Sequence, residues 1–309
     1  MGYNGEIYNH KDIQDELEQS GIRMTGRSDT EVLVSAIDKW GLAHTLQKIN
    51  GMFAFALWDK QEKNLTLVRD RLGKKPLYIG WITPHQIAFT SELKSLYHHS
   101  EFTGEIDRNV LAQFMRYGYV PAPLCIYEGL VQLLPGSLIR LDLANPSPER
   151  NLARVMEPYW HAGQVVEMAR QKAPVTHDQA YSDIKQLLRD AVKKRLISDV
   201  PVGSFLSGGL DSSLVTAVMC ETAETQINTY SIGFAEDAYN EANYAREIAN
   251  HLQTTHHEKI LTHQDALDII PLMPQIYDEP FADPSQIPTT LICQYAKQDI
   301  TVALTGDGG

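Results

Sequence analysis

The stretch Val202-Gly-Ser-Phe-Leu-Ser-Gly-Gly-Leu-Asp-Ser-Ser213 decides the fold of the C-terminal half of this 309-residue chain. A short, mainly apolar run leads into Gly208 and Gly209, and a helical pattern begins at the serines, which predicts a strand, a tight turn and a helix. Paired glycines bring backbone N–H groups toward an anion, and the helix N-terminus adds its dipole. A Gly-Gly turn alone would also fit a corner packed by small residues, whereas the full stretch indicates a phosphate-binding loop.

The side chains of this loop suit a nucleotide with a metal ion. Ser207, Ser212 and Ser213 supply hydroxyl donors, and Asp211 supplies a carboxylate for Mg²⁺. The loop lacks the lysine of a Walker A sequence, and it is not a G-x-G-x-x-G fingerprint.

Strands and helices alternate around the loop from residue 178 onward, which predicts a parallel α/β sheet. We expect strands at 200–206, 229–234, 257–261 and 300–304, and helices at 212–221, 241–252 and 286–298. A further helix is expected to bury a stripe formed by Ile184, Leu187, Leu188, Ala191, Val192 and Leu196. The last strand leads into Thr305-Gly-Asp-Gly-Gly309, expected to be a ligand-binding turn, so we expect the chain to be truncated there.

The N-terminal half has a different pattern, with two early helices and then short β-rich runs. The helices are expected at residues 10–20 and after a cap at Ser28 or Asp29. Strands are expected at 51–58, 65–68, 76–79 and 86–90, which predicts a layered β-rich domain over residues 1–143. Residues 144–177, with their Asn-Pro-Ser-Pro, Glu-Pro and Ala-Pro dipeptides, are expected to be an interdomain linker.

Composition excludes several classes of protein. The chain has 27 Lys+Arg and 39 Asp+Glu, a net charge of −12, which argues against a nucleic-acid partner held by net charge. No apolar run has the ~18–20 residues of a membrane helix, so no membrane association is expected. The three cysteines are far apart and are expected to be reduced, buried thiols of a cytoplasmic protein. His256-His257-Glu258 could suggest a metal site, and it also stands where a strand is expected to begin.

Motifs in both halves of the chain resemble known families. Ser207–Ser213 resembles the pyrophosphate loop of the ATP-pyrophosphatase family, whose members split ATP between its α- and β-phosphates and adenylate a substrate oxygen. Four N-terminal motifs resemble the glutaminase domain of class II amidotransferases, namely Asn4-Gly-Glu-Ile-Tyr-Asn9, Ser28-Asp-Thr-Glu31, Gly51-Met-Phe-Ala-Phe-Ala56 and Arg69-Asp-Arg-Leu-Gly-Lys-Lys-Pro-Leu-Tyr78. Taken in this order, the motifs are similar to the glutamine-hydrolysing asparagine synthetase family, over nearly the whole chain.

The resemblance implies an α+β and α/β chain with two incomplete domains. Residues 1–143 would form an Ntn-hydrolase-like αββα glutaminase domain, 144–177 a linker, and 178–309 the start of the ATP-pyrophosphatase domain. Asn4 and the N–H of Gly5 would form the oxyanion hole, and Glu6 and Asp29 would join them in holding glutamine. The family's nucleophile is an N-terminal cysteine, whereas the first cysteine here is Cys125, so we expect this chain to have no glutaminase activity by itself.

For the second domain the resemblance implies ATP and Mg²⁺ as cofactors, with Asp211 as the metal ligand and Asp307 near the reacting carboxyl group. The residues expected to bind ATP and pyrophosphate are Phe205, Leu206, Ser207, Gly208, Gly209, Asp211, Ser212, Ser213, Ile232, Thr305 and Gly306. The parent reaction would convert aspartate, glutamine and ATP into asparagine, glutamate, AMP and pyrophosphate in the cytoplasm, and a homodimer is expected.

Three alternatives to this function stay open. The stretch Asp278–Ser285, expected to line the substrate side, resembles a branch often associated with bacterial polysaccharide gene clusters, so the acceptor could be a sugar acid. An intramolecular amide, as in β-lactam-forming relatives, is a second alternative. A non-catalytic, nucleotide-binding remnant is the third.

Overall fold

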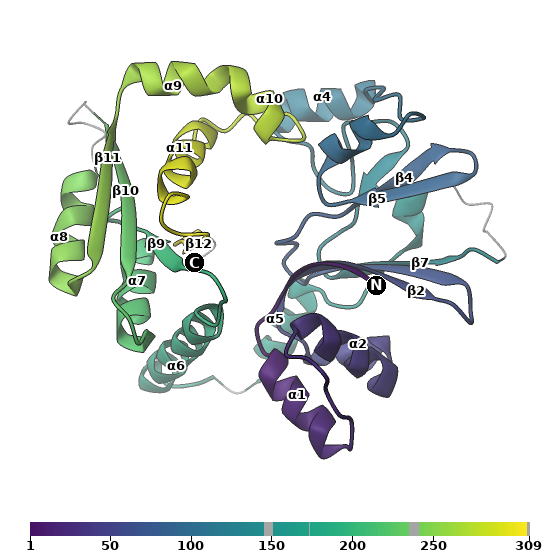
Figure 1. Ribbon diagram of the computed structural model, residues 1–309, viewed down its shortest axis with the longest axis horizontal. Coiled ribbons are helices and arrows are strands. Elements are labelled where there is room, and N and C mark those ends of the chain that lie inside the picture. Colours follow the sequence, from purple (N-terminus) through teal and green to yellow (C-terminus); the bar gives the residue numbers. More distant parts are fainter. Residues whose placement is uncertain (145–150, 173, 235–240, 308–309) are drawn as a thin grey trace. The chain divides into compact units, whose positions relative to one another are not determined.

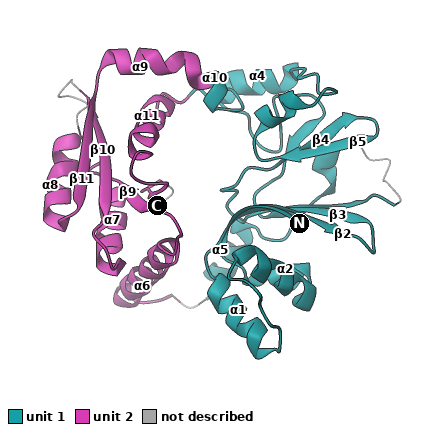
Figure 2. Ribbon diagram, viewed as in Figure 1, with its two compact units in different colours: residues 1–173, 274–282 teal, residues 174–273, 283–309 magenta. Residues whose placement is uncertain are grey.

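The computed structural model describes residues 1–144, 151–172, 174–234 and 241–307 (Figure 1). The chain divides into two compact units (Figure 2). The first comprises residues 1–173 and 274–282, and the second comprises 174–273 and 283–309. Segment 274–282 thus joins the first unit, although the sequence pattern placed it in the second domain. The Asn145-Pro-Ser-Pro148 motif and Ala173 of the predicted linker lie outside the described residues.

The first unit is built on two antiparallel sheets. The larger has the order β1-β2-β3-β7-β8, and the smaller has the order β5-β4-β6. The larger contains β1 (Gly2–Ile7), β2 (Gly51–Asp59), β3 (Asn64–Arg69), β7 (Ser137–Asp142) and β8 (Met156–Pro158). The smaller contains β4 (Tyr78–Thr83), β5 (Gln86–Thr90) and β6 (Leu130–Gln132).

Three hydrophobic cores pack the two sheets against each other and against the helices on their outer faces. Alternation along β2 divides its side chains, because successive residues of a strand face opposite sides. Phe53 and Phe55 join a core with Leu17 of α1 (His10–Gln19) and Leu33 of α2 (Asp29–Trp40), next to α3 (Leu42–Lys48). Ala54 and Ala56 join a second core with Leu67 of β3 and Ile79 of β4, which lies between the sheets. A third core packs Tyr78 of β4 against Leu93 of η1 (Leu93–His98) and Val110 of α4 (Arg108–Tyr117). The layers are helix, sheet, sheet and helix, which confirms the predicted αββα class.

The second unit is built on a parallel sheet with the order β11-β10-β9-β12. Its strands are β9 (Val202–Phe205), β10 (Asn228–Phe234), β11 (Thr255–Leu261) and β12 (Val302–Leu304). Its helices are α6 (His177–Arg195), α7 (Leu210–Thr222), α8 (Ala242–Leu252), α9 (His263–Ile269), η4 (Ile270–Leu272) and α11 (Gln286–Ala296), and the short α10 (Met273–Ile276) leads from this unit into segment 274–282. The predicted parallel α/β class is confirmed.

The chain order of these strands reverses at β9. From β9 the chain adds β10 and β11 on one side, and then returns to place β12 on the other side of β9. Open parallel sheets bind ligands at the carboxyl ends of strands where the order reverses. The phosphate loop predicted from sequence follows β9, and therefore lies at this point.

Several local predictions were wrong. The predicted linker contains β8, which pairs with β7, and also η2 (Leu152–Val155) and α5 (Ala162–Arg170). Ile184 and Leu187 of α6 are 65% and 68% exposed, because this helix packs through a narrower stripe formed by Leu188, Val192 and Leu196. The three cysteines are free, yet only Cys125 is buried and Cys293 is exposed.

Among the described residues, no helix has both the length and the apolar character that crossing a membrane requires.

Candidate functional site

The loop between β9 and α7 has a backbone that only glycine adopts easily. Gly208 has φ +80°, in the left-handed region. A Cβ at this position would lie 2.8 Å from Cβ of Tyr244 and 3.0 Å from the backbone nitrogen of Ala245, both on α8. Gly208 therefore allows both the turn and the close approach of the loop to α8.

Hydrogen bonds within the loop fix its shape. The backbone N–H of Ser207 donates to Oγ of Ser212 (3.2 Å), and the two serine hydroxyls lie 2.9 Å apart. The hydroxyl of Ser213 donates to the carbonyl oxygen of Gly209 (2.6 Å), one turn earlier at the start of α7. The loop is thus organised by its own residues, and the Ser213 hydroxyl is directed toward the helix backbone.

Strand β12 brings a second turn against this loop. Val302 and Leu304 pair with Val202 and Ser204 of β9, so the two strands end side by side. A Cβ on Gly306 would lie 2.6 Å from the backbone nitrogen of Ser212. Glycine at 306 therefore permits the turn after β12 to touch the beginning of α7.

These two turns open into a cavity of about 520 Å³ in the second unit. Ten residues predicted to act at this site line it: Phe205, Leu206, Ser207, Gly209, Asp211, Ser212, Ile232, Thr305, Gly306 and Asp307. Gly208 and Ser213 are not among its lining residues. The sequence pattern did not reveal Leu210, Ser231, Phe234, Glu241, Ala242, Ala245, Pro288, Thr289 and Ile292. Pro288, Thr289 and Ile292 belong to α11, which reaches the cavity only through tertiary packing. No local sequence motif therefore indicated them.

The lining combines carboxylates with apolar side chains. Asp211, Glu241 and Asp307 contribute carboxylates, and the described lining residues include no lysine or arginine. An oligophosphate could enter only with cations, since its charge would otherwise meet carboxylates of the same sign. Ile232 and Ile292 are apolar lining residues, which suit the flat ring of a base. The donor set therefore fits a nucleotide bound with a divalent cation.

His256 of β11 contacts a residue that lines the cavity. Its Nε2 lies 3.2 Å from Oγ of Ser231, a lining residue, and its Nδ1 lies 2.9 Å from Oγ1 of Thr229. Burial lowers the pKa of His256, which favours the neutral imidazole. Residues 256–258 lie within β11, which pairs with β10, so the predicted entry of this stretch into a strand is confirmed.

In the first unit, β1 presents the predicted glutaminase residues along one edge of the larger sheet. Asn4, Gly5 and Glu6 pair with Ala54, Phe53 and Met52 of β2. Asn4 and Glu6 are exposed, while the intervening Gly5 lies so close to β2 that a Cβ would collide with the carbonyl oxygen of Met52. The side-chain amide of Asn4 donates from Nδ2 to Oγ of Ser91 (3.1 Å).

Asp29 has a structural role in addition to its predicted one. Its Oδ2 accepts hydrogen bonds from the Tyr3 hydroxyl (2.6 Å) and from the Ile7 N–H (3.0 Å). Burial, together with the Asp29 carboxylate, raises the pKa of Tyr3, so this phenol stays protonated and donates. Asp29 thus ties α2 to β1, and its Oδ1 accepts a hydrogen bond from the Thr30 hydroxyl (3.4 Å).

The Arg69–Tyr78 motif builds the turn behind β2. Asp70 is only 1% exposed, and its carboxylate accepts from the N–H groups of Phe53, Leu72, Lys74 and Lys75 at 2.9–3.2 Å. Arg69 donates to the carbonyl oxygens of Gly73, Lys75 and Leu133. Phe53 is the register partner of Gly5, so this motif supports the strand that carries the predicted oxyanion hole.

Two family models match the chain, one in each half. The family model described as glutamine amidotransferase domain matches residues 1–160, and the one described as asparagine synthase matches residues 183–309. The chain belongs to the glutamine-hydrolysing asparagine synthetase family.

Curated relatives agree. A putative asparagine synthetase (glutamine-hydrolyzing) 2 of Methanocaldococcus jannaschii is 35% identical, over 99% of this chain and 57% of the relative. Asparagine synthetase (glutamine-hydrolyzing) 1 of Bacillus subtilis is 33% identical, over 99% of this chain and 46% of the relative. Asparagine synthetase (glutamine-hydrolyzing) 2 of Arabidopsis thaliana is 35% identical, over 86% of this chain and 40% of the relative. The chain thus spans about half the length of the curated relatives it matches.

Within this asparagine synthetase family chain, Cys125 is unsuited to act as the glutaminase nucleophile. Its side chain is 2% exposed and packs in the third core of the first unit. Burial raises the pKa of the Cys125 thiol to about 12, so the thiol stays protonated at neutral pH. Because the thiolate is the nucleophilic form, Cys125 is a packing residue.

Proposed function

We propose that this chain provides the glutaminase half and the nucleotide-binding part of a Mg·ATP-dependent amide ligase. The observation that carries the proposal is the preformed Ser207–Ser213 loop at the reversal point between β9 and β12, with the Thr305-Gly306 turn against it. The family membership and the lining of the cavity support the same conclusion. As domains of this ligase, we propose that the glutaminase includes residues 1–143 together with strand β8, and that residues 178–309 contain the start of the synthetase.

The proposed chemistry of the second unit follows from its lining. Backbone N–H groups of the loop and the hydroxyls of Ser207 and Ser212 would hold the two phosphates that leave as pyrophosphate. Asp211 would hold Mg²⁺, whose charge offsets that of the phosphates when bound. Ile232 would contact the adenine. Asp307 would lie at the acceptor carboxyl group, which attacks the α-phosphate and displaces pyrophosphate.

The proposed chemistry of the first unit concerns the amide of glutamine. An amide NH₂ has two donor hydrogens, and Ser91 engages one of those of Asn4. The second hydrogen, together with the Gly5 N–H, would stabilise the oxyanion that forms when a cysteine attacks the glutamine amide. Glu6 and Asp29 would bind the α-ammonium group of glutamine. Ammonia released there would trap the acyl-adenylate, with aspartate as the first candidate acceptor.

The test is a product analysis with the complete gene product that contains this chain. With glutamine, aspartate, Mg²⁺ and ATP, we expect AMP, pyrophosphate and asparagine in equal amounts. Formation of ADP and phosphate would contradict the proposal. AMP formed only with a sugar carboxylate would change the acceptor and keep the mechanism. ATP binding without turnover would favour the non-catalytic alternative.

A further inference from the structure

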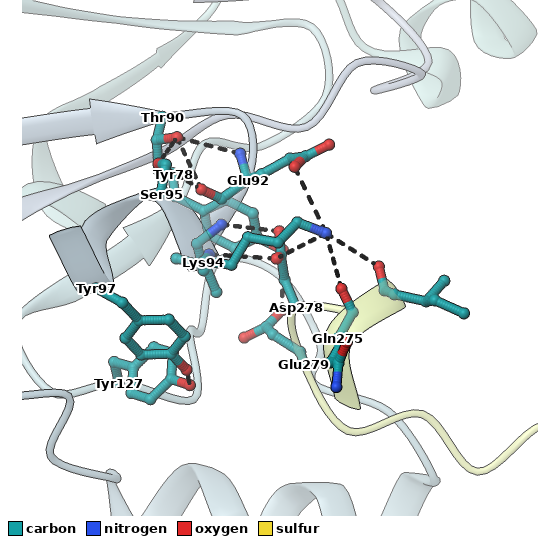
Figure 3. A network of polar contacts seen from close by, with 12 residues as sticks. Tyr78, Thr90, Glu92, Lys94, Ser95, Tyr97, Tyr127, Gln275, Asp278 and Glu279 are labelled. Atoms are coloured by element: carbon teal, nitrogen blue, oxygen red, sulfur yellow. Dashed lines mark hydrogen bonds and ion pairs between the residues drawn. The ribbon is translucent and has the colours of Figure 1, made fainter. Parts of the chain in front are cut away.

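A segment of the synthetase sequence is folded into the glutaminase unit. Residues 274–282 lie within the 183–309 match to asparagine synthase. In the structure, however, they pack with the first unit. Asp278 and Glu279 of this segment do not line the nucleotide cavity. Figure 3 shows Asp278 and Glu279 with several of the residues around them.

Glu279 anchors the segment. Its Oε2 accepts from the hydroxyl of Tyr78 (3.0 Å), and its Oε1 accepts from the backbone N–H of Ile126 (2.8 Å). The N–H of Ala282 donates to the carbonyl oxygen of Gly118 (2.8 Å). Burial raises the pKa of Glu279, although both of these hydrogen bonds oppose that shift. The segment is therefore held to β4, to the residues before β6 and to the end of α4.

Asp278 binds the turn that follows β5. Its carboxylate accepts from the N–H groups of Leu93 (2.8 Å) and Lys94 (3.3 Å), and its side chain is only 14% exposed. These two N–H groups open η1, where a helix provides no backbone acceptor. Lys94 Nζ donates in turn to the carbonyl oxygens of Gln275 and Ile276 at 3.3 and 3.2 Å (Figure 3).

The same turn carries the partner of the candidate oxyanion residue. Ser91, two residues before Leu93, accepts the hydrogen bond from Asn4 Nδ2. Thr90 Oγ1 donates to the carbonyl oxygen of Glu92, and the Ser95 hydroxyl donates to the same oxygen (2.7 Å), so residues 90–95 form one closed turn. A cavity of about 360 Å³ lies between Ser91, Glu92 and Lys94 on one side and residues 276–281 on the other.

We propose that Asp278 is a positioning residue for the glutaminase site, fixing the 90–95 turn so that Ser91 orients the side-chain amide of Asn4. The role rests on the proposed glutaminase function. Asp278 acts through Leu93, Lys94 and Ser91, and does not touch the substrate. A residue of the synthetase sequence thereby completes the glutaminase site.

The first readout needs no activity and uses this chain as it is. In Asp278→Ala, backbone amide exchange at Leu93 and Lys94 is expected to accelerate about tenfold or more, since each loses a charged acceptor. Asp278→Asn keeps one carbonyl acceptor and should show an intermediate effect. The matched control is Glu92→Gln, because Glu92 pairs with the same Lys94 (3.5 Å) and binds neither amide. Unchanged exchange in Asp278→Ala would overturn the proposal.

The second readout is glutamine hydrolysis by the complete gene product that contains this chain. Asp278→Ala is expected to lower kcat about tenfold with KM within twofold, since the oxyanion exists only in the transition state. Asp278→Asn should recover part of kcat, and Glu92→Gln should match the wild type. A rise in KM at constant kcat, or an equal loss in Glu92→Gln, would overturn the positioning role. Absence of hydrolysis in the wild type would instead contradict the glutaminase proposal, and the exchange experiment would still decide the role of Asp278.

Discussion

Replacing Asn4 by alanine lowers glutamine-dependent turnover ~10²–10³-fold, the usual loss when one oxyanion donor is removed. The expectation follows from the exposed Asn4 amide on β1, which gives one hydrogen to Ser91 and would have the other for the proposed oxyanion. The loss should appear in kcat rather than in KM, because the negative charge develops only in the transition state. The measurement is steady-state glutaminase kinetics with the complete gene product that contains this chain.

Two controls separate this role from damage to the fold. Asn109→Ala changes an exposed asparagine on α4 and should leave glutamine hydrolysis unchanged. In the complete gene product, synthesis supplied with free ammonia should be unaffected by Asn4→Ala, since ammonia bypasses the glutaminase. If ammonia-dependent synthesis fell as far as glutamine-dependent synthesis, the assignment of Asn4 to the glutaminase would be wrong.

Replacing Gly208 by alanine weakens ATP binding roughly 30-fold or more. Left-handed backbone costs an L-residue about 1–2 kcal/mol, and forcing an extra methyl group into a packed site costs about 1–3 kcal/mol. Both penalties apply, since Gly208 has φ +80° and its Cβ would meet Tyr244 and Ala245. We expect the loop to relieve them by moving away from α8, which would take its N–H groups away from the proposed phosphate site. Titration calorimetry with Mg·ATP measures the effect.

Gly209→Ala is the matched control for this prediction. Gly209 has φ −73°, which alanine adopts freely, and its Cβ would lie 3.3 Å from the rotatable Ser207 hydroxyl. Its effect on ATP affinity should stay below about threefold, within the small cost of an unstrained substitution. Equal losses in the two variants would show that loop geometry at Gly208 does not determine affinity.

Sequence reasoning succeeded where the signal is local. The strand, glycine turn and helix around Ser207–Ser213 are encoded by consecutive residues, and the Ser28 cap of α2 is observed with its side chain accepting from the Thr30 N–H (3.2 Å). The layers of the first unit followed from the resemblance and are visible in the alternation of β2.

Sequence patterns did not reveal the contacts that depend on tertiary packing. Ser91 meets Asn4 across 87 residues, and Asp278 meets Leu93 across 185, so no spacing in the sequence could reveal either contact. The residues of α11 that line the cavity of the second unit are also far in sequence from the Ser207–Ser213 loop. The predicted stripe on α6 was too wide, because an apolar pattern gives the face of a helix and not the extent of its cover.

ATP binding by this chain, measured with and without Mg²⁺, shows whether the second unit holds ATP through Mg²⁺ as proposed. We predict binding with Mg²⁺ and at least a roughly tenfold loss when EDTA removes it, since the described lining offers three carboxylates and no lysine or arginine. Asp211→Asn should reproduce most of that loss in the presence of Mg²⁺ while the thermal unfolding midpoint stays unchanged. Equal affinity in Mg²⁺ and in EDTA, or an unaffected Asp211→Asn, would contradict the account.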